Sequence, residues 1–214
     1  MSRSTTYRYL QSLRDVGLVD GTNGDGAFGL GPRVLQLARV ARMGFGLSEI
    51  ALPVMRRLSR QVGETVLLCR RMGEHVVCLE REEAARPIRL AFERGHILPV
   101  NAGASAKVLL AWADADDVES LLSGGPLQRF TQTTLVDPED LRENLATIRG
   151  SGYAVSHGER DEGVLGIAAP IRGSDGRVAG SLSIAALEYR VTKSQVEDFV
   201  RAVCAAASEI SALL

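Results

Sequence analysis

The sequence predicts an α+β protein in which a small basic module precedes a larger acidic domain with a mostly antiparallel sheet. Apolar residues make up 45% of the 214 residues, which is enough for a sizeable core. Candidate strands lie close to their pairing partners in the sequence, and candidate helices come in separate groups. Charge is uneven although the net charge is -1. Residues 1–43 carry six arginines against three aspartates, whereas the remainder carries 19 basic against 23 acidic residues.

Composition and charge exclude several classes of protein. The apolar fraction excludes a disordered chain, and no apolar run approaches the roughly 18 to 20 residues that a membrane span needs. We also expect no leader segment, because no basic-then-apolar run opens the sequence. Three cysteines, at 69, 78 and 204, are too few and too unevenly spaced for a disulfide framework or a zinc ribbon. We therefore expect a cytoplasmic protein with no metal, no cofactor and no membrane partner.

Residues 1–31 predict a helix followed by a two-stranded wing. Ser2 or Ser4 can cap the helix, Gly17 can end it, and its buried side would carry Thr6, Leu10 and Leu13. Short strands at 18–19 and 27–30 flank the turn-rich segment 23–26. Pro32 then opens a helix in the segment 32–46, which we interpret as a linker ending at the glycines 44 and 46.

Residues 47–214 predict one domain in which helices alternate with locally paired strands. Ser48 can cap its first helix, which runs to about Val62. The other expected helices lie at 104–113, 116–122, 138–150 and from 192 onward. The expected strands lie at 65–72, 75–82, 88–93, 153–157, 166–172 and 177–186. In the hairpin around Gly73-Glu74, Cys69 would face Cys78. That geometry permits a redox-sensitive bridge, although two packed core thiols are the more common arrangement.

Two segments have side chains that could carry chemistry. The start of the first helix has Arg and hydroxyl residues that suit a major groove, although an ordinary amphipathic surface helix has the same pattern. Ser105 and Lys107 could form a nucleophile and its base, but only His157 follows them, so we expect a tight helix entry and not an enzyme. N–H groups at such an entry suit a carboxylate. The three histidines, at 75, 96 and 157, have no metal-ligand spacing, and the acids Glu159 and Asp161 near His157 could bind a metal or could equally lie in a solvated loop.

Several segments in order resemble the IclR-type transcriptional regulators. They are Ser2 to Leu10, Gly17-Leu18-Val19, Leu30 to Leu35, Gly63 to Val66, Gly152 to Val155 and Ile167 to Ile171. Each is short, but together they run in register across essentially the whole chain. The resemblance implies a partial winged helix-turn-helix, a linker helix and a GAF-like effector domain. It also implies a homodimer or homotetramer that binds a double-stranded DNA operator and a small organic metabolite.

The resemblance also implies site residues. On the recognition helix they are Arg3, Ser4, Thr5, Thr6 and Arg8; in the effector pocket they are Gly103, Ala104, Ser105, Ser156, Gly166 and Ser183, with Ala185 nearby. The family often has His at the position of Asn101, Asp near Ser156, Cys at the position of Gly166 and Ser at that of Ala185. A roomier, less charged pocket is expected from these changes, which favours an aromatic or larger acid over a glyoxylate-like or pyruvate-like one.

The family also carries further helices before the residues that match Met1 to Ser4. Two functional hypotheses follow. The first is a ligand-responsive DNA-binding regulator encoded by a truncated gene model or fragment. The second is a metabolite-sensing or oligomerisation module that does not bind DNA because the supporting helices are missing.

Overall fold

The computed structural model describes residues 2–21, 27–43, 46–83 and 93–214, with the backbone alone at 39–43. The chain divides into two compact units, Met1–Gly46 and Leu47–Leu214. No helix in the described part of the chain is long and apolar enough to cross a membrane.

The first unit consists of α1 (Arg3–Asp15), β1 (Val19–Gly21), β2 (Phe28–Leu30) and α2 (Pro32–Met43). Ser2 is the N-cap of α1, where its hydroxyl accepts a hydrogen bond from the Thr5 N–H at 3.3 Å. β1 and β2 pair antiparallel, with Val19 opposite Leu30, as expected for a wing. The turn expected at 23–26 lies outside the described residues.

The prediction that one side of α1 is buried is wrong for this unit. No residue of α1 is buried, and Leu13 is 39% exposed. The physical reason is size, because the main neighbour of α1 within the unit is the three-residue strand β1. A three-residue strand cannot cover a helix of 13 residues.

The second unit contains a six-stranded sheet in the order β5-β4-β3-β8-β7-β6. Every neighbouring pair is antiparallel, which confirms the expected α+β fold with its mostly antiparallel sheet. The strands are β3 (Thr65–Met72), β4 (His75–Glu82), β5 (Ile97–Leu98), β6 (Ala154–His157), β7 (Val164–Arg172) and β8 (Val178–Leu187).

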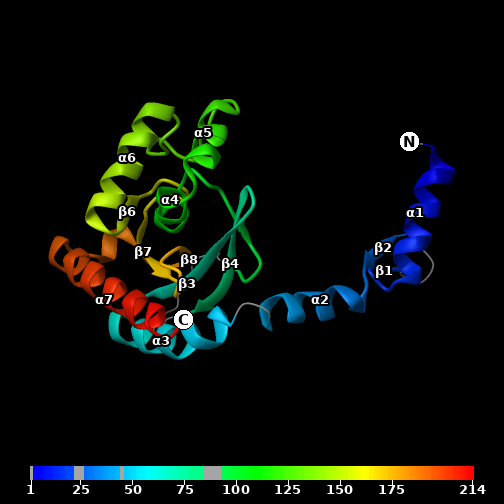
Figure 1. The fold of residues 1–214 in the computed structure, drawn as a ribbon, viewed down its shortest axis with the longest axis horizontal. Coiled ribbons are helices and arrows are strands. Elements are labelled where there is room, and N and C mark those ends of the chain that lie inside the picture. The colour runs from blue at the N-terminus through cyan, green and yellow to red at the C-terminus, as the bar shows by residue number, and fades with distance from the viewer. Residues whose placement is uncertain (1, 22–26, 44–45, 84–92) are drawn as a thin grey trace. The chain divides into compact units, whose positions relative to one another are not determined.

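Helices cover both faces of this sheet (Figure 1). One face packs against α3 (Leu47–Val62) and α7 (Lys193–Ser211), and the aliphatic core lies between them. The other face packs against α4 (Ala104–Ala111), with α5 (Ala115–Ser123) and α6 (Pro138–Ser151) beside it. Asp137 caps α6, and Thr192 caps α7 in a capping box with Gln195. A single turn of 3₁₀ helix, η1 (Glu188–Arg190), joins β8 to α7.

Two expected elements of the second unit differ from the structure. Ser48 is not a cap: α3 begins one residue earlier, and Ser48 is a buried residue of its first turn. The strand expected at 88–93 falls almost entirely outside the described residues. The sheet instead gains the two-residue strand β5 at Ile97–Leu98, which is too short to leave a periodic signal in the sequence.

Candidate ligand-binding site

A cavity of about 50 Å³ lies where α4 begins, against β6, β7 and β8. Apolar side chains such as Leu67 and Leu98 form part of its wall. All seven residues that the family resemblance implies for the effector pocket line this one cavity. They are Gly103, Ala104, Ser105, Ser156, Gly166, Ser183 and Ala185. The fold therefore brings together residues that lie up to 82 positions apart in the chain.

The entry to α4 directs backbone donors toward this cavity. Gly103 is the N-cap and has φ of 90°, a left-handed conformation that glycine adopts without strain. The Gly103 N–H donates to Oε2 of Glu159 at 3.1 Å, and the Ala104 N–H donates to Oγ of Ser156 at 3.1 Å. The first intrahelical bond runs from the Lys107 N–H to the Gly103 carbonyl. The N–H groups of the three residues between them therefore have no acceptor within the helix, and that of Ala104 is the one that bonds to Ser156.

Ser105 does not assemble with a base. Its hydroxyl donates to the Ser183 hydroxyl at 2.7 Å, a short bond between two buried side chains. Lys107 Nζ pairs with Glu159 instead, and Nδ1 of His157 lies 2.6 Å from Glu188 Oε1. With these partners, neither Lys107 nor His157 is placed to accept the proton of the Ser105 hydroxyl. Ser105 instead acts as a polar wall of the cavity.

Lys107 and Glu159 form a buried ion pair with 2.5 Å between Nζ and Oε1. The two side chains are 1% and 9% exposed, so the expectation that Glu159 lies in a solvated loop is wrong. The cause is the partner, because a buried ammonium group requires a compensating charge. The sequence carried a signal for this pair, since Lys107 stands alone among apolar and small residues in 104–111.

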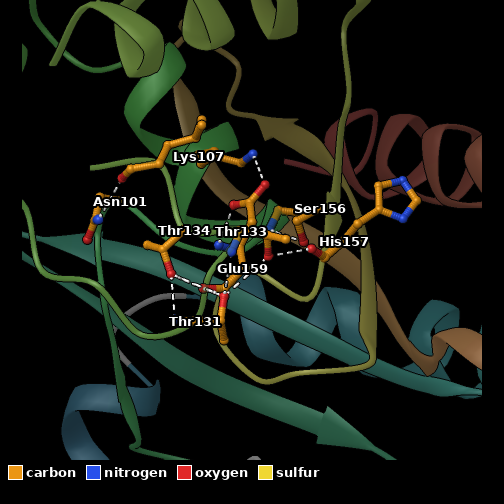
Figure 2. A network of polar contacts seen from close by, with 11 residues as sticks. Asn101, Lys107, Thr131, Thr133, Thr134, Ser156, His157 and Glu159 are labelled. Carbon is orange, nitrogen blue, oxygen red and sulfur yellow. Dashed lines mark hydrogen bonds and ion pairs between the residues drawn. The ribbon is translucent and has the colours of Figure 1, made fainter. Parts of the chain in front are cut away.

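A threonine cluster holds the backbone that carries Glu159 (Figure 2). Thr134 and Thr131 donate through their hydroxyls to the Glu159 carbonyl at 2.7 and 3.3 Å, and Thr133 donates to the His157 carbonyl at 2.8 Å. Residues 131–134 therefore fix the segment from which Glu159 reaches both Lys107 and the start of α4. Sequence reasoning did not assign a role to any of these threonines.

The cavity is small, and the prediction that it is roomier than the pockets of other family members stays a prediction. A Cβ at Gly166 would lie 2.7 Å from Oγ of Ser156 and 3.4 Å from Cβ of Ala104. The space that Gly166 leaves is therefore used by close approach of its neighbours, and the Glu159 carboxylate closes the helix entry. Asn101 does not line this cavity. Its amide donates to the carbonyls of Gln128 and Leu135 at 3.0 and 3.2 Å, so it holds the 126–135 segment against the residues that precede α4.

The residues expected to contact DNA lie in the first two turns of α1. Arg3, Ser4, Thr6 and Arg8 are exposed, and Thr5 is partly covered. The Thr5 hydroxyl lies 2.8 Å from the Ser2 hydroxyl, so it belongs to the helix cap. Four side chains of this group are thus accessible to a partner, and the fifth has a structural role.

In the described part of the chain, no group of three or more His, Cys, Asp or Glu side chains is placed to hold a metal ion.

Comparison with known proteins identifies the family. The family described as "Bacterial transcriptional regulator IclR C-terminal" matches residues 41–212. The HTH-type transcriptional regulator BhcR of Paracoccus denitrificans is 34% identical over 99% of this chain and 76% of its own length. The HTH-type transcriptional regulator KdgR of Escherichia coli is 31% identical over 99% of this chain and 81% of its own.

Solved structures agree with these relatives. An IclR transcriptional regulator from a Silicibacter species has a TM-score of 0.91 at 30% identity, covering 100% of this chain and 84% of its own. An IclR homologue from Microbacterium hydrocarbonoxydans, solved with 4-hydroxybenzoate, has a TM-score of 0.84 at 32% identity, covering 99% and 85%. The named relatives are transcriptional regulators, in agreement with the expectation that the chain is not an enzyme. The chain therefore belongs to the IclR family of bacterial transcriptional regulators.

Proposed function

We propose that this protein is a cytoplasmic, ligand-responsive regulator whose second unit binds a small organic acid in the cavity at the start of α4. Binding would alter the affinity of α1 and its wing for a double-stranded DNA operator, within a homodimer or homotetramer. The observation that carries the proposal is the polar contact already present at the helix entry: a carboxylate, that of Glu159, accepts the Gly103 N–H at 3.1 Å. A ligand carboxylate has the same chemistry and would be stabilised by the same end of the helix dipole.

The polar groups of the cavity suggest how an acid would be oriented. Its carboxylate would accept the N–H groups at the start of α4, and the hydroxyls of Ser105 and Ser183 would bind a second polar group of the ligand. Leu67 and Leu98 would contact its apolar part. A 50 Å³ cavity accommodates about three to five waters, so a ligand of few heavy atoms fits with Glu159 in place. A larger acid requires Glu159 to move.

The 4-hydroxybenzoate bound by the Microbacterium relative supports an aromatic acid as one candidate. We would titrate the full chain with 4-hydroxybenzoate, pyruvate and 4-hydroxybenzamide and measure heat by calorimetry. Binding of either acid without binding of the amide supports the proposal. Equal binding of the acid and the amide would contradict the assigned role of the helix entry.

Coupling to DNA is tested separately with α1 variants. DNA fragments selected by the purified protein from genomic DNA serve as the operator. Arg8→Ala should weaken binding and reduce the slope of log affinity against log salt by about 1, because one phosphate contact is lost. Arg14→Ala, in the last turn of α1, is the matched control and should change neither. Ligand affinity should be the same in all three proteins.

The linkage between the two sites gives the decisive measurement. If the ligand changes operator affinity by some factor, the operator must change ligand affinity by the same factor. A protein that binds acids but no DNA fragment would instead support the alternative of a metabolite-sensing or oligomerisation module.

A further inference from the structure

Two cysteines of adjacent strands face each other beside the cavity. Cys69 of β3 lies opposite Cys78 of β4, as the hairpin turn predicts. Both side chains are fully buried, and both belong to the cluster on the α4 face that also contains Ala106 and Leu109. The two sulfurs therefore project from the sheet on the same side.

The register set by the turn holds as far as this pair. From Met72 opposite His75 to Cys69 opposite Cys78 the ladder is regular, and it shifts by one residue between Leu68 and Cys69, so that Leu68 lies opposite Glu80. The irregularity therefore begins directly beyond the two cysteines and leaves their pairing intact.

The backbone hydrogen bonds of Cys78 indicate that Cys69 and Cys78 are a non-hydrogen-bonded pair of the ladder. The Cys78 N–H donates to the His96 carbonyl at 3.0 Å, and its carbonyl accepts the Gly95 N–H at 2.7 Å. Both backbone groups therefore point away from β3. A facing pair that exchanges no backbone bonds has its Cα atoms about 4.5 Å apart. That separation lies within the range of about 4.4 to 6.8 Å that disulfides span, so a bridge requires little backbone movement.

The two thiols also differ in their pKa values. The hydrogen bond from the Cys69 thiol lowers the pKa of Cys78 and raises the pKa of Cys69 well above its ordinary value. The nearby Arg81 and Arg94 lower the pKa of Cys78 further, whereas burial and Glu80 oppose them. These effects favour Cys78 as the thiol that ionises first and is therefore the more nucleophilic of the two.

We propose that Cys69 and Cys78 are a redox modification site, which forms a cross-strand disulfide when a peroxide reaches the core. The Cys78 thiolate attacks one peroxide oxygen, the O–O bond breaks, and the departing hydroxide is protonated to water. The resulting sulfenic acid of Cys78 is attacked by the Cys69 sulfur, an S–S bond forms, and a second water leaves with the Cys69 proton. Two thiols are oxidised by two electrons, and one peroxide is reduced to two waters.

This proposal does not depend on the ligand assigned above. Cys69 nevertheless lies beside the cavity wall, because the Ser105 hydroxyl is near enough to lower the pKa of its thiol. Ser105 lines the cavity and donates its hydroxyl proton to Ser183. A disulfide would draw the Cys69 sulfur toward Cys78 and change the surroundings of a pocket hydroxyl.

The test is peptide mapping of the full chain after exposure to hydrogen peroxide. Free thiols are blocked with N-ethylmaleimide under denaturing conditions, and the protein is digested with trypsin. Cleavage after Arg60, Arg70, Arg71 and Arg81 places the two cysteines on separate peptides, 61–70 and 72–81. We expect these peptides joined with the loss of two hydrogens, released by dithiothreitol, and a fall from three blocked thiols to one.

Variants assign the bridge. Cys204→Ser should leave the joined peptides unchanged, because that half-buried thiol on α7 lies in the other core. Cys69→Ser and Cys78→Ser should each abolish them, and the agreement of two separate variants guards against misfolding of one. Three blocked thiols after peroxide exposure would overturn the proposal. So would sulfinic acid at Cys78 without a bridge, or a bridge that involves Cys204.

Discussion

The two faces of the six-stranded sheet are built from the same strands but bury different side chains. Along β8, Leu182, Ile184 and Ala186 belong to the core beneath α3 and α7. The residues between them, Ser183 and Ala185, line the cavity beside α4. The alternation of a strand thus directs large aliphatic groups to one face and small or polar groups to the other.

This difference separates stability from binding. The face beneath α3 and α7 is closely packed and aliphatic, so burial of apolar surface there supports the fold. The α4 face has a cavity lined by small residues such as Ala104 and Ala185 and by polar groups that bond to one another. Because buried polar groups stabilise only when their partners are present, the α4 face should be the more sensitive to removal of a single group.

The largest effect is expected where the α4 face holds a charge. Lys107→Met would leave the Glu159 carboxylate buried without its cation, and breaking a buried pair in this way costs about 3 to 5 kcal/mol of unfolding free energy. Urea unfolding at neutral pH, followed by the fluorescence of Trp112, measures the loss.

Its control is the second half of a double-mutant cycle. Glu159→Gln added to Lys107→Met should recover part of the loss, because it removes the uncompensated charge. If the single variant were as stable as the parent, the ion pair would be energetically neutral and the contrast between the faces would fail.

A smaller effect is expected in the aliphatic face. Met55 of α3 is fully buried, and Met55→Ala should cost about 2 to 5 kcal/mol through lost contacts and the void left behind. Ligand affinity of the folded fraction should not change, because Met55 lies in the core beneath α3 and α7. Ile97→Ala, at a residue that is 56% exposed, is the matched apolar control and should change stability little. Weakened binding by the Met55 variant would mean that the two faces are coupled.

Sequence reasoning and structure agree best where the signal is local. The hairpin of β3 and β4, the Ser2 cap of α1 and the pairing of β1 with β2 depend on turn and cap chemistry within a few residues, and all are present. β5 was missed because two residues carry no period, and Ser48 resembles a cap although the helix begins before it.

The site was harder to predict than the fold. The seven cavity residues followed from resemblance to a family, not from spacing, because they meet only when the sheet forms. The role of Glu159 was not predicted, because it depends on Lys107, which lies 52 positions earlier in the sequence. The hydrogen bonds from Thr131 and Thr134 to the Glu159 carbonyl could not be predicted for the same reason. Long-range polar partners leave no periodic pattern in a sequence.

A third prediction sharpens the contrast at the cavity itself. Gly166→Ala would place a methyl group 2.7 Å from the Ser156 hydroxyl, so the neighbours must shift or the cavity must close. Overpacking of this kind costs about 1 to 3 kcal/mol, less than either change above. Binding of 4-hydroxybenzoate, if the parent binds it, should fall by about tenfold or more, since the loss of 1.4 kcal/mol of binding free energy is a factor of ten.

The matched rescue is Ser156→Ala in the Gly166→Ala protein. Removing the hydroxyl relieves the 2.7 Å contact, so stability should return toward that of the Ser156→Ala single variant. A Gly166→Ala protein as stable as the parent, with unchanged ligand affinity, would show that the close approach does not shape the cavity.

The smallest effect is expected outside the sheet, where charges are exposed. Arg142 of α6 donates to both carboxylate oxygens of Glu119 on α5, at 3.1 and 2.9 Å, and this bond lowers the pKa of Glu119. A lowered pKa means that the pair stabilises the fold above the unfolded-state pKa of about 4.3 and that this contribution is lost as pH falls through the folded-state value. Thermal unfolding of the parent and of Glu119→Gln should therefore differ slightly at pH 7, and the difference should vanish in acid.

Glu143→Gln, at an exposed residue of α6, controls for removal of a surface charge. A gap that widened on acidification would reverse the sign of this argument. Exposed pairs such as this one are screened by water, whereas the Lys107 pair is not, so the two variants measure the same chemistry in two dielectrics.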